Sequence, residues 1–219
     1  MRDELREQTR GAYNVVAADY AAMIPDTSFE APLDLAMVDE FVRLVGARRL
    51  RRVLDAGCGA GRMVTYLQSA TPRLEVTGVD LSEEMIALAQ QAHPTARFVQ
   101  ADITYTPFQA EQFDAVLAWY SIIHLAPAQM QNVVTEFARL LTPGGLVLLS
   151  YQIGTGERQL IKPYGHDIEL RAFLYQTDGV VKTLAAAGFE IIARLDRSPR
   201  KTERHAQGFV LAERPYQHQ

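Results

Sequence analysis

The chain has 219 residues, 48% of them hydrophobic and 22% charged, and a formal net charge of −4. These values fit a single domain over residues 1–219 with a substantial core, and the negative charge disfavours nucleic acid or an anionic membrane as a partner. The single cysteine, Cys58, excludes an internal disulfide. No apolar run reaches the ~18 residues of a membrane span. We therefore expect a cytoplasmic protein.

The first 46 residues are expected to form an N-terminal helical cap. The start, MRDELREQTR, is too charged for a secretory signal. Residues 1–23 fit a helix that places Tyr13 and Tyr20, seven positions apart, on one face. These tyrosines either pack the helix onto the domain or close over a ligand. After a break, residues 31–46 resume the helical pattern.

From residue 53 the chain alternates between short apolar strands and helices. The expected strands cover residues 53–56, 74–80, 96–101, 113–119, 146–151, 189–195 and 207–213, and the expected helices cover residues 60–69, 82–92, 127–141 and 177–187. Apolar strands separated by helices predict a parallel sheet covered on both faces. No helix separates the last two strands, which therefore pair antiparallel. The predicted fold class is α/β: a Rossmann-like seven-stranded, mostly parallel sheet with an antiparallel last strand and helices on both faces.

The glycine-rich stretch VLDAGCGAGR, residues 53–62, predicts a nucleotide site. Gly57, Gly59 and Gly61 carry no Cβ that would keep a ligand away from the backbone, and the following helix offers unpaired N–H groups at its positive end. Asp80 follows 19 positions after Gly61, at the end of the next strand. An acid at this spacing can accept hydrogen bonds from ribose hydroxyls, so the two features agree.

The spacing of the glycines distinguishes a dinucleotide-binding loop from other nucleotide-binding loops. The dinucleotide fingerprint is G-x-G-x-x-G, whereas this chain has G-x-G-x-G, with Arg62 where the third glycine would fall. The sequence DAGCGAG at residues 55–61, followed by GVD at residues 78–80, resembles the class I S-adenosylmethionine-dependent methyltransferases. The resemblance covers about residues 50–152, and the reversed last strand is a feature of the same fold. It implies S-adenosyl-L-methionine as cofactor and S-adenosyl-L-homocysteine as product.

Acidic residues follow three successive strands, at the edge where ligands of open α/β sheets bind. Asp55 ends the first strand, and Asp80 ends the second, followed by Leu81. At the third strand end, Asp102 can accept the exocyclic amino hydrogens of adenine while Ile103 covers the ring, a pairing often found in the family that this chain resembles. Each acid can instead cap a loop or begin a helix or turn. Their occurrence at three strand ends favours a binding site.

The end of the fourth strand is expected beside the transferred methyl group. Trp119 and Tyr120 suit a cationic ligand, because aromatic faces attract cations by roughly 0.5–2 kcal/mol, although they can equally pack a lid. His124 follows four positions after Tyr120, and its ordinary pKa of about 6.5 suits a general base. Its alternative role is structural hydrogen bonding. The region lacks an Asn/Asp-Pro-Pro-Tyr sequence and a Pro-Cys loop, which disfavours enzymes that methylate nucleobases.

Residues 151–176 form the longest segment without clear periodicity, and such segments are usually lids or binding loops. The segment is polar, aromatic and mildly basic: it contains Tyr151, Gln152, Arg158, Lys162, Tyr164, His166, Arg171 and Tyr175. We expect it to act as a substrate lid, together with the first helix. Its composition favours a small acceptor with hydroxyl, amine or carboxylate groups. The candidate substrate-binding residues are Tyr151, Tyr164, His166 and Arg171.

The prediction is an enzyme, an S-adenosylmethionine-dependent methyltransferase that acts on the O, N or S atom of a small molecule. The expected cofactor-binding residues are Tyr13, Tyr20, Asp55, Gly57, Cys58, Gly59, Gly61, Arg62, Asp80, Leu81, Met85, Ala101, Asp102, Ile103, Ala118, Trp119 and Tyr120, and His124 is the candidate catalytic residue. No His/Cys/Asp cluster indicates a metal. The acceptor and the oligomeric state stay open.

Two other functions remain as alternatives. An NAD-dependent oxidoreductase is opposed by Arg62 and by the terminal strand pair. A non-catalytic module that binds S-adenosylmethionine would need the same cofactor residues, so the sequence does not exclude it.

Overall fold

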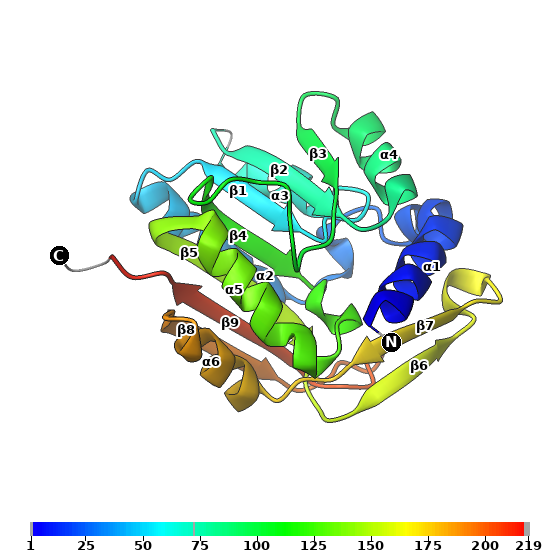
Figure 1. Cartoon of the computed structure of the whole chain (residues 1–219). Helices are drawn as coiled ribbons and strands as arrows, with labels where there is room; N and C mark the ends of the chain where they lie inside the picture. Colours follow the sequence, from blue (N-terminus) through cyan, green and yellow to red (C-terminus); the bar gives the residue numbers. More distant parts are fainter. Residues whose placement is uncertain (1, 72, 217–219) are drawn as a thin grey trace.

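The parallel strands of one large sheet organise the molecule. A computed structural model describes residues 2–71 and 73–216. The strands of the large sheet are β1 (Arg52–Ala56), β2 (Glu75–Asp80), β3 (Arg97–Gln100), β4 (Phe113–Trp119), β5 (Leu141–Gln152), β8 (Glu190–Arg197) and β9 (Gln207–Glu213), in the order β3-β2-β1-β4-β5-β9-β8 (Figure 1). β9 pairs antiparallel with β5 and β8, and the remaining pairs are parallel. The predicted fold class is confirmed.

The order of the strands reverses at β1, which pairs with β2 on one side and β4 on the other. Asp55, near the end of β1, is in register with Gly78 of β2 and Leu117 of β4. Ligands bind at such a switch point because the loops that leave the two neighbouring strands diverge there and open a crevice. The glycine loop that follows β1 therefore lies at the position where this fold favours a ligand.

Helices cover both faces of the sheet. α2 (Pro32–Ala47), α3 (Arg62–Ala70) and α4 (Glu83–Ala92) pack on one face, and α5 (Met130–Leu140) and α6 (Thr177–Ala186) pack on the other. All of β4 is buried, as expected of a central strand covered on both sides. The predicted start of α4 is also confirmed, because the hydroxyl of Ser82 accepts a hydrogen bond from the N–H of Met85 at 3.1 Å.

α1 (Arg2–Met23) and a small two-stranded sheet lie at the end of the molecule toward which the parallel strands point (Figure 1). The small sheet consists of β6 (Glu157–Ile161) and β7 (Glu169–Phe173), joined through η4 (Pro163–Gly165). α1 contacts α4, β7 and η4, so it bridges the two sides of this end. α2, by contrast, packs within the core and does not lie over the strand ends.

The hairpin formed by β6 and β7 corrects the expectation that residues 151–176 have no regular structure. β6 is mostly exposed and contains Arg158 and Gln159, so its sequence lacks the alternation that identifies a half-buried strand. On β7, Leu170 and Ala172 are buried. The strands pair over five residues each and are supported by α1, a contact distant in the sequence.

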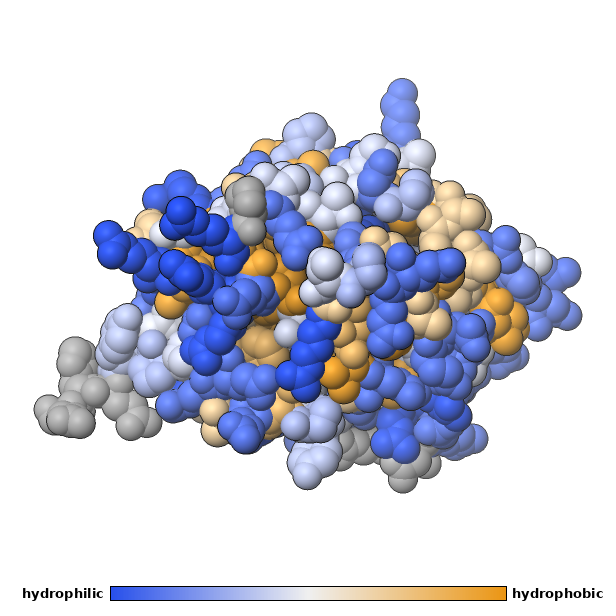
Figure 2. All heavy atoms as spheres, turned by 90° about the horizontal axis from the view of Figure 1, so that it is seen from above, coloured by the Kyte–Doolittle hydropathy of each residue, from blue (hydrophilic) through white to orange (hydrophobic). Residues whose placement is uncertain are grey.

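Polar side chains dominate the face of the molecule shown in Figure 2, and apolar side chains appear in smaller areas between them. In the described part of the chain, no helix combines the length and the apolar character that crossing a bilayer requires.

A buried ion pair fixes the start of α2 against the last two strands. Arg197 at the end of β8 donates to both carboxylate oxygens of Asp34, at 2.5 and 2.6 Å. It also donates to Glu203 at 2.6 and 2.8 Å, in the turn that leads to β9. The side chains of Arg197 and Asp34 are only 7% and 1% exposed. Such a pair contributes stability only while both partners are present, because each charge is costly to bury alone.

We therefore predict that Arg197→Met lowers the free energy of unfolding by about 3–5 kcal/mol, because it leaves the Asp34 charge buried without its partner. Arg194→Met is the matched control on the same strand, since Arg194 is 51% exposed and pairs with Asp178 at the surface. It is expected to cost less than about 1 kcal/mol. Urea denaturation of the three proteins measures both effects, and equal losses in the two variants would contradict the role given to Arg197.

Candidate functional site

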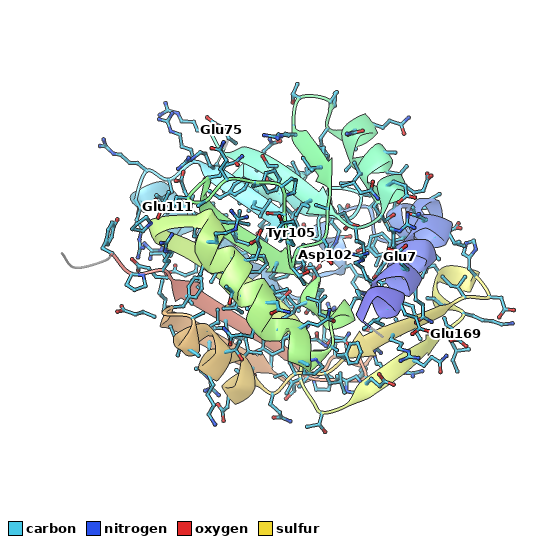
Figure 3. The ribbon with its side chains drawn as sticks, in the orientation of Figure 1. Glu7, Glu75, Asp102, Tyr105, Glu111 and Glu169 are labelled. Atoms are coloured by element: carbon cyan, nitrogen blue, oxygen red, sulfur yellow. The ribbon has the colours of Figure 1, made fainter. Side chains whose placement is uncertain are left out.

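A cavity of about 500 Å³ lies at the carboxyl ends of the parallel strands, a volume typical of small-molecule sites. α1, the β6–β7 hairpin and the loops after β1 to β5 line it. Among the predicted site residues, its wall contains Tyr13, Tyr20, Gly57, Gly59, Arg62, Asp80, Leu81, Met85, Ala101, Asp102, Ile103, Trp119, Tyr120, His124 and Tyr164. In Figure 3, Asp102 lies on the side of the sheet that faces α1, whereas Glu75 and Glu111 lie at the opposite end. The structure thus brings residues from six parts of the chain to one cavity.

Four predicted cofactor residues lie outside the cavity wall. Asp55, Cys58 and Ala118 are buried at or next to the strand ends, and Gly61 begins α3. Gly61 has a φ of +87°, and a side chain there would meet His93. Asp55 and Ala118 thus lie beneath the glycine loop, whereas Cys58 and Gly61 are part of it.

Three of the four predicted substrate residues also lie outside the cavity wall. Tyr151 is fully buried in the core, where its ring contacts Tyr175. The His166 ring pairs with Asp19 of α1 at 2.6 Å. The side chain of Arg171 is 47% exposed and lies 4.0 Å from a carboxylate oxygen of Glu157. Of the four, only Tyr164 lines the cavity.

The glycine loop approaches the turn after β4 so closely that Gly57 has no room for a side chain. Gly57 has a φ of +83°, and a Cβ on it would lie 2.2 Å from the Cβ of Ser121. The N–H groups of Gly57 and Cys58 donate to the carbonyl of Val79 at 2.7 and 2.9 Å. The loop is therefore held against β2 on one side and contacts the end of β4 on the other.

Asp80 at the end of β2 joins the glycine loop to the start of α4. One of its carboxylate oxygens accepts the N–H of Gly59 and the other accepts the N–H of Ser82, both at 2.9 Å. Burial raises the pKa of Asp80, while the backbone N–H groups oppose this shift. An ionised carboxylate has about four acceptor positions, so Asp80 can also accept two ligand hydroxyls, as a ribose would offer.

Asp102, after β3, continues the wall beside apolar side chains. One of its carboxylate oxygens accepts the N–H and the hydroxyl of Thr104 at 2.8 and 2.7 Å. Ile103 and Leu81 line the cavity next to it. An acceptor beside two branched apolar side chains suits a planar ring that carries an amino group, such as adenine.

Asp55 is a carboxylate that the protein leaves uncompensated. Within the described part of the chain, neither of its side-chain oxygens has a hydrogen-bond partner. Burial raises its pKa to about 7, while the nearby Arg62 acts in the opposite direction. A buried carboxylate without partners favours either a bound proton or a nearby cationic group. The glycine loop therefore lies over a site that attracts positive charge.

Glu30, which the sequence did not indicate, connects the loop to β4. It accepts hydrogen bonds from the guanidinium of Arg62 and from the indole N–H of Trp119, the latter at 3.0 Å. The ring of Trp119 also contacts Tyr120 and Phe209. Trp119 is thus fixed in the wall with its polar atom satisfied, as buried tryptophans usually are.

Both ring nitrogens of His124 are occupied. Nδ1 lies 2.8 Å from the carbonyl oxygen of Arg171, which can only accept, so Nδ1 carries the hydrogen. Nε2 then accepts from the hydroxyl of Tyr13 at 2.6 Å. Burial lowers the pKa of His124 to about 4. A neutral His124 therefore ties α1 to β7 across the cavity wall.

Several further lining residues were not among the predicted site residues. They are Ser121 after β4, Gln152 at the end of β5, Arg158 on β6, and Arg200, Glu203 and Gln207 before or within β9. Gln152 and Arg158 fall in the segment expected to act as a substrate lid. The last three lie at the cavity because the reversed last strand returns beside β5.

Known proteins with related sequences share the central part of this chain. Residues 53–145 match a family model described as a methyltransferase domain. The malonyl-[acyl-carrier protein] O-methyltransferase of Enterobacter lignolyticus is 36% identical over 60% of this chain and 51% of its own length. The fatty-acid O-methyltransferase of Mycolicibacterium smegmatis is 38% identical over 50% of this chain and 42% of its own length. The chain thus spans about half the length of the curated relatives that it matches.

Among solved structures, the 1,6-didemethyltoxoflavin-N1-methyltransferase of Burkholderia thailandensis has a similar fold. The similarity covers 98% of this chain and 91% of that chain, with a TM-score of 0.72 and 22% sequence identity. That protein was crystallised with S-adenosylhomocysteine and 1,6-didemethyltoxoflavin bound. Since the identity is low, this likeness describes the fold, which extends well beyond the residues matched by the family model.

The uncompensated Asp55 predicts a pH dependence of stability in the ligand-free protein. Its pKa is about 7 in the folded state and about 3.9 in an unfolded chain. Between these values the unfolded state loses the Asp55 proton first, so stability falls as the pH rises, by up to about 1.4 kcal/mol per pH unit. We expect Asp55→Asn to remove this decrease between pH 5 and 7.

Urea denaturation at several pH values, without ligand, measures the effect. Glu75→Gln, an exposed acid on β2, is the control and is expected to keep the wild-type pH dependence. Parallel stability curves for the wild type and Asp55→Asn would show that Asp55 is already ionised in the folded protein.

Proposed function

We propose that this chain is a class I S-adenosylmethionine-dependent methyltransferase that transfers a methyl group from S-adenosyl-L-methionine to a small molecule. The match of residues 53–145 to a methyltransferase domain and the order of the strands in the large sheet support this proposal. The observation that carries the proposal is the cavity wall formed by the glycine loop, Asp80 and Asp102 at the strand ends. The names of two curated relatives, both O-methyltransferases, favour an oxygen atom as the acceptor.

The residues of the cavity fit the three parts of this cofactor. Asp80 has acceptor positions left for the ribose hydroxyls, and Asp102 with Ile103 suits adenine. Asp55 lies beneath the glycine loop and outside the cavity wall, and a cationic methionine part bound above that loop would favour its ionised form. Gly57 and Gly59 leave the backbone open to close approach.

Bound S-adenosyl-L-methionine supplies a methyl group on a sulfonium sulfur, and methyl transfer releases a neutral thioether that needs no proton. The protein therefore contributes mainly by orienting the acceptor and by excluding water. α1 and the hairpin, which line the cavity on the side away from the sheet, are suited to that exclusion.

The two alternative functions account less well for these observations. In NAD-dependent oxidoreductases a third glycine is expected where this chain has Arg62, whose guanidinium is bonded to Glu30 in the cavity wall. A non-catalytic module would have no need of a polar cavity wall beyond the cofactor residues, yet here the wall continues over Gln152, Arg158 and Gln207.

We assign His124 a positioning role instead of the general-base role expected from its place in the sequence. A base needs a free nitrogen within reach of the acceptor proton, whereas Nε2 of His124 already accepts from Tyr13. A pKa of about 4 also makes it a weak base near pH 7. Its bonds to Tyr13 and to the carbonyl of Arg171 instead hold α1 and β7 together at the cavity.

Asp80→Asn tests the cofactor assignment. We expect it to weaken the binding of S-adenosylhomocysteine by ~10-fold to 100-fold, because the amide replaces a charged acceptor of the ribose hydroxyls. Glu75→Gln, at the other end of the same strand, is expected to bind as the wild type does. Isothermal titration calorimetry measures both, with NAD as a competing ligand. Binding of NAD by a protein that ignores S-adenosylhomocysteine would rule out the proposal.

Tyr13→Phe and His124→Ala test the positioning role. Both remove the same hydrogen bond, so each is expected to lower kcat by roughly tenfold, and the double variant should be little worse than either single variant. Between pH 6 and 8 the ratio of wild-type to His124→Ala rates is expected to stay constant, because His124 remains neutral. A ratio that falls toward 1 as the pH drops through about 7 would instead identify His124 as a base.

A further inference from the structure

Arg158 is a cation in the cavity wall whose side chain has no partner among the residues that the structure describes. It lies on β6 and is half-buried, and its Nε is buried without a hydrogen-bond acceptor. Among the described residues it forms neither an ion pair nor a hydrogen bond. Two other arginines that line the cavity, Arg62 and Arg200, are each paired with a glutamate. Arg158 is thus the kind of buried charge that a protein keeps only at a cost.

The surroundings of Arg158 do not compensate its charge. Burial lowers the pKa of Arg158, and another cation, Arg204, acts in the same direction. The groups that favour its charged form are the phenols of Tyr164 and Tyr13, which are neutral near pH 7. The N–H groups of the Arg158 guanidinium are therefore free to donate hydrogen bonds to an anion in the cavity.

Arg158 comes from the β6–β7 hairpin, whereas the predicted cofactor acids come from the ends of the parallel strands. It affects the titration of His124, which follows β4, and of Tyr13 on α1. Arg62, at the start of α3, affects the titration of Asp55 beneath the glycine loop, and both arginines affect that of Tyr164. Arg158 thus acts on groups of α1, the hairpin and the turn after β4.

Other groups of the cavity wall indicate the chemical character of the ligand. The hydroxyl of Ser121 and the amide oxygen of Gln152 are buried without partners in the described part of the chain. Ile123, Leu125, Leu160 and Pro163 line the same cavity and are apolar. A ligand that satisfies this wall combines a charged or polar end with an apolar body.

We propose that Arg158 binds a carboxylate of the methyl acceptor, so that the substrate is an organic acid with an apolar body. The proposal rests on the function proposed above and names its substrate class. A guanidinium binds a carboxylate through two parallel N–H···O bonds, and the two single charges balance. A phosphate ester carries between one and two negative charges near pH 7, which a single arginine does not balance.

The test measures binding of matched ligand pairs to the protein saturated with S-adenosylhomocysteine. Each pair is a monocarboxylate and its primary amide, from acetate through hexanoate, decanoate, benzoate and phenylacetate, with octyl phosphate as the phosphate probe. We expect at least one carboxylate to bind about tenfold or more tightly than its amide.

Arg158→Gln is expected to remove this preference for the carboxylate while leaving the affinity for the amide and for S-adenosylhomocysteine unchanged. Arg158→Lys should restore part of the preference, because it returns the charge without the paired donors. Lys162→Gln is the matched control: it removes an exposed cation of the same hairpin that lies outside the cavity wall.

The outcomes separate this inference from the proposed function. If S-adenosylhomocysteine does not bind, the proposed function fails. If it binds but no carboxylate is preferred over its amide, or if Arg158→Gln keeps the preference, only the role of Arg158 fails. Tighter Arg158-dependent binding of octyl phosphate than of every carboxylate would overturn the assignment to organic acids.

Discussion

The candidate site depends on the close approach between the glycine loop and the turn after β4. A Cβ on Gly57 would lie 2.2 Å from the Cβ of Ser121, so the two loops touch through backbone and a single short side chain. This contact brings the acidic strand ends of β1 to β3 and the polar groups after β4 and β5 into one cavity. A side chain at residue 57 would push the two loops apart and change the shape of this cavity.

The structure contains two kinds of buried charge, which have different consequences. Arg197 is bonded to Asp34 and Glu203 in the core, and the three together hold α2 against β8. Asp55 and Arg158 have no such partners within the described part of the chain. Compensated charges of this type fix the fold, whereas uncompensated charges beside a cavity indicate what the cavity attracts.

The sequence was sufficient for the features that depend on local spacing. The strands and helices of the large sheet, its reversed strand, and the positions of Asp80 and Asp102 at strand ends follow from patterns within a few residues of each other. Tyr151 shows the limit of this approach. In a strand, neighbouring side chains point to opposite faces, so Tyr151 enters the core while Gln152 lines the cavity.

Features that depend on distant contacts could not be predicted in the same way. The bond between Tyr13 and His124 joins residues 111 positions apart, and Glu30 meets Trp119 over 89 positions. The β6–β7 hairpin packs against α1, and the sequence of the hairpin contains no pattern that predicts this contact. That the guanidinium of Arg158 has no carboxylate partner can be recognised only from the three-dimensional positions of the neighbouring acids.

The hairpin also affects which residues of this protein can vary in evolution. Its strands pair only with each other, and a bridge between Ile153 and Tyr175 closes the base of the hairpin. Residues on β6 can therefore vary without disturbing any hydrogen bond of the large sheet. Evolution can thus change the side chains that β6 contributes to the cavity while the glycine loop and the acidic strand ends stay the same.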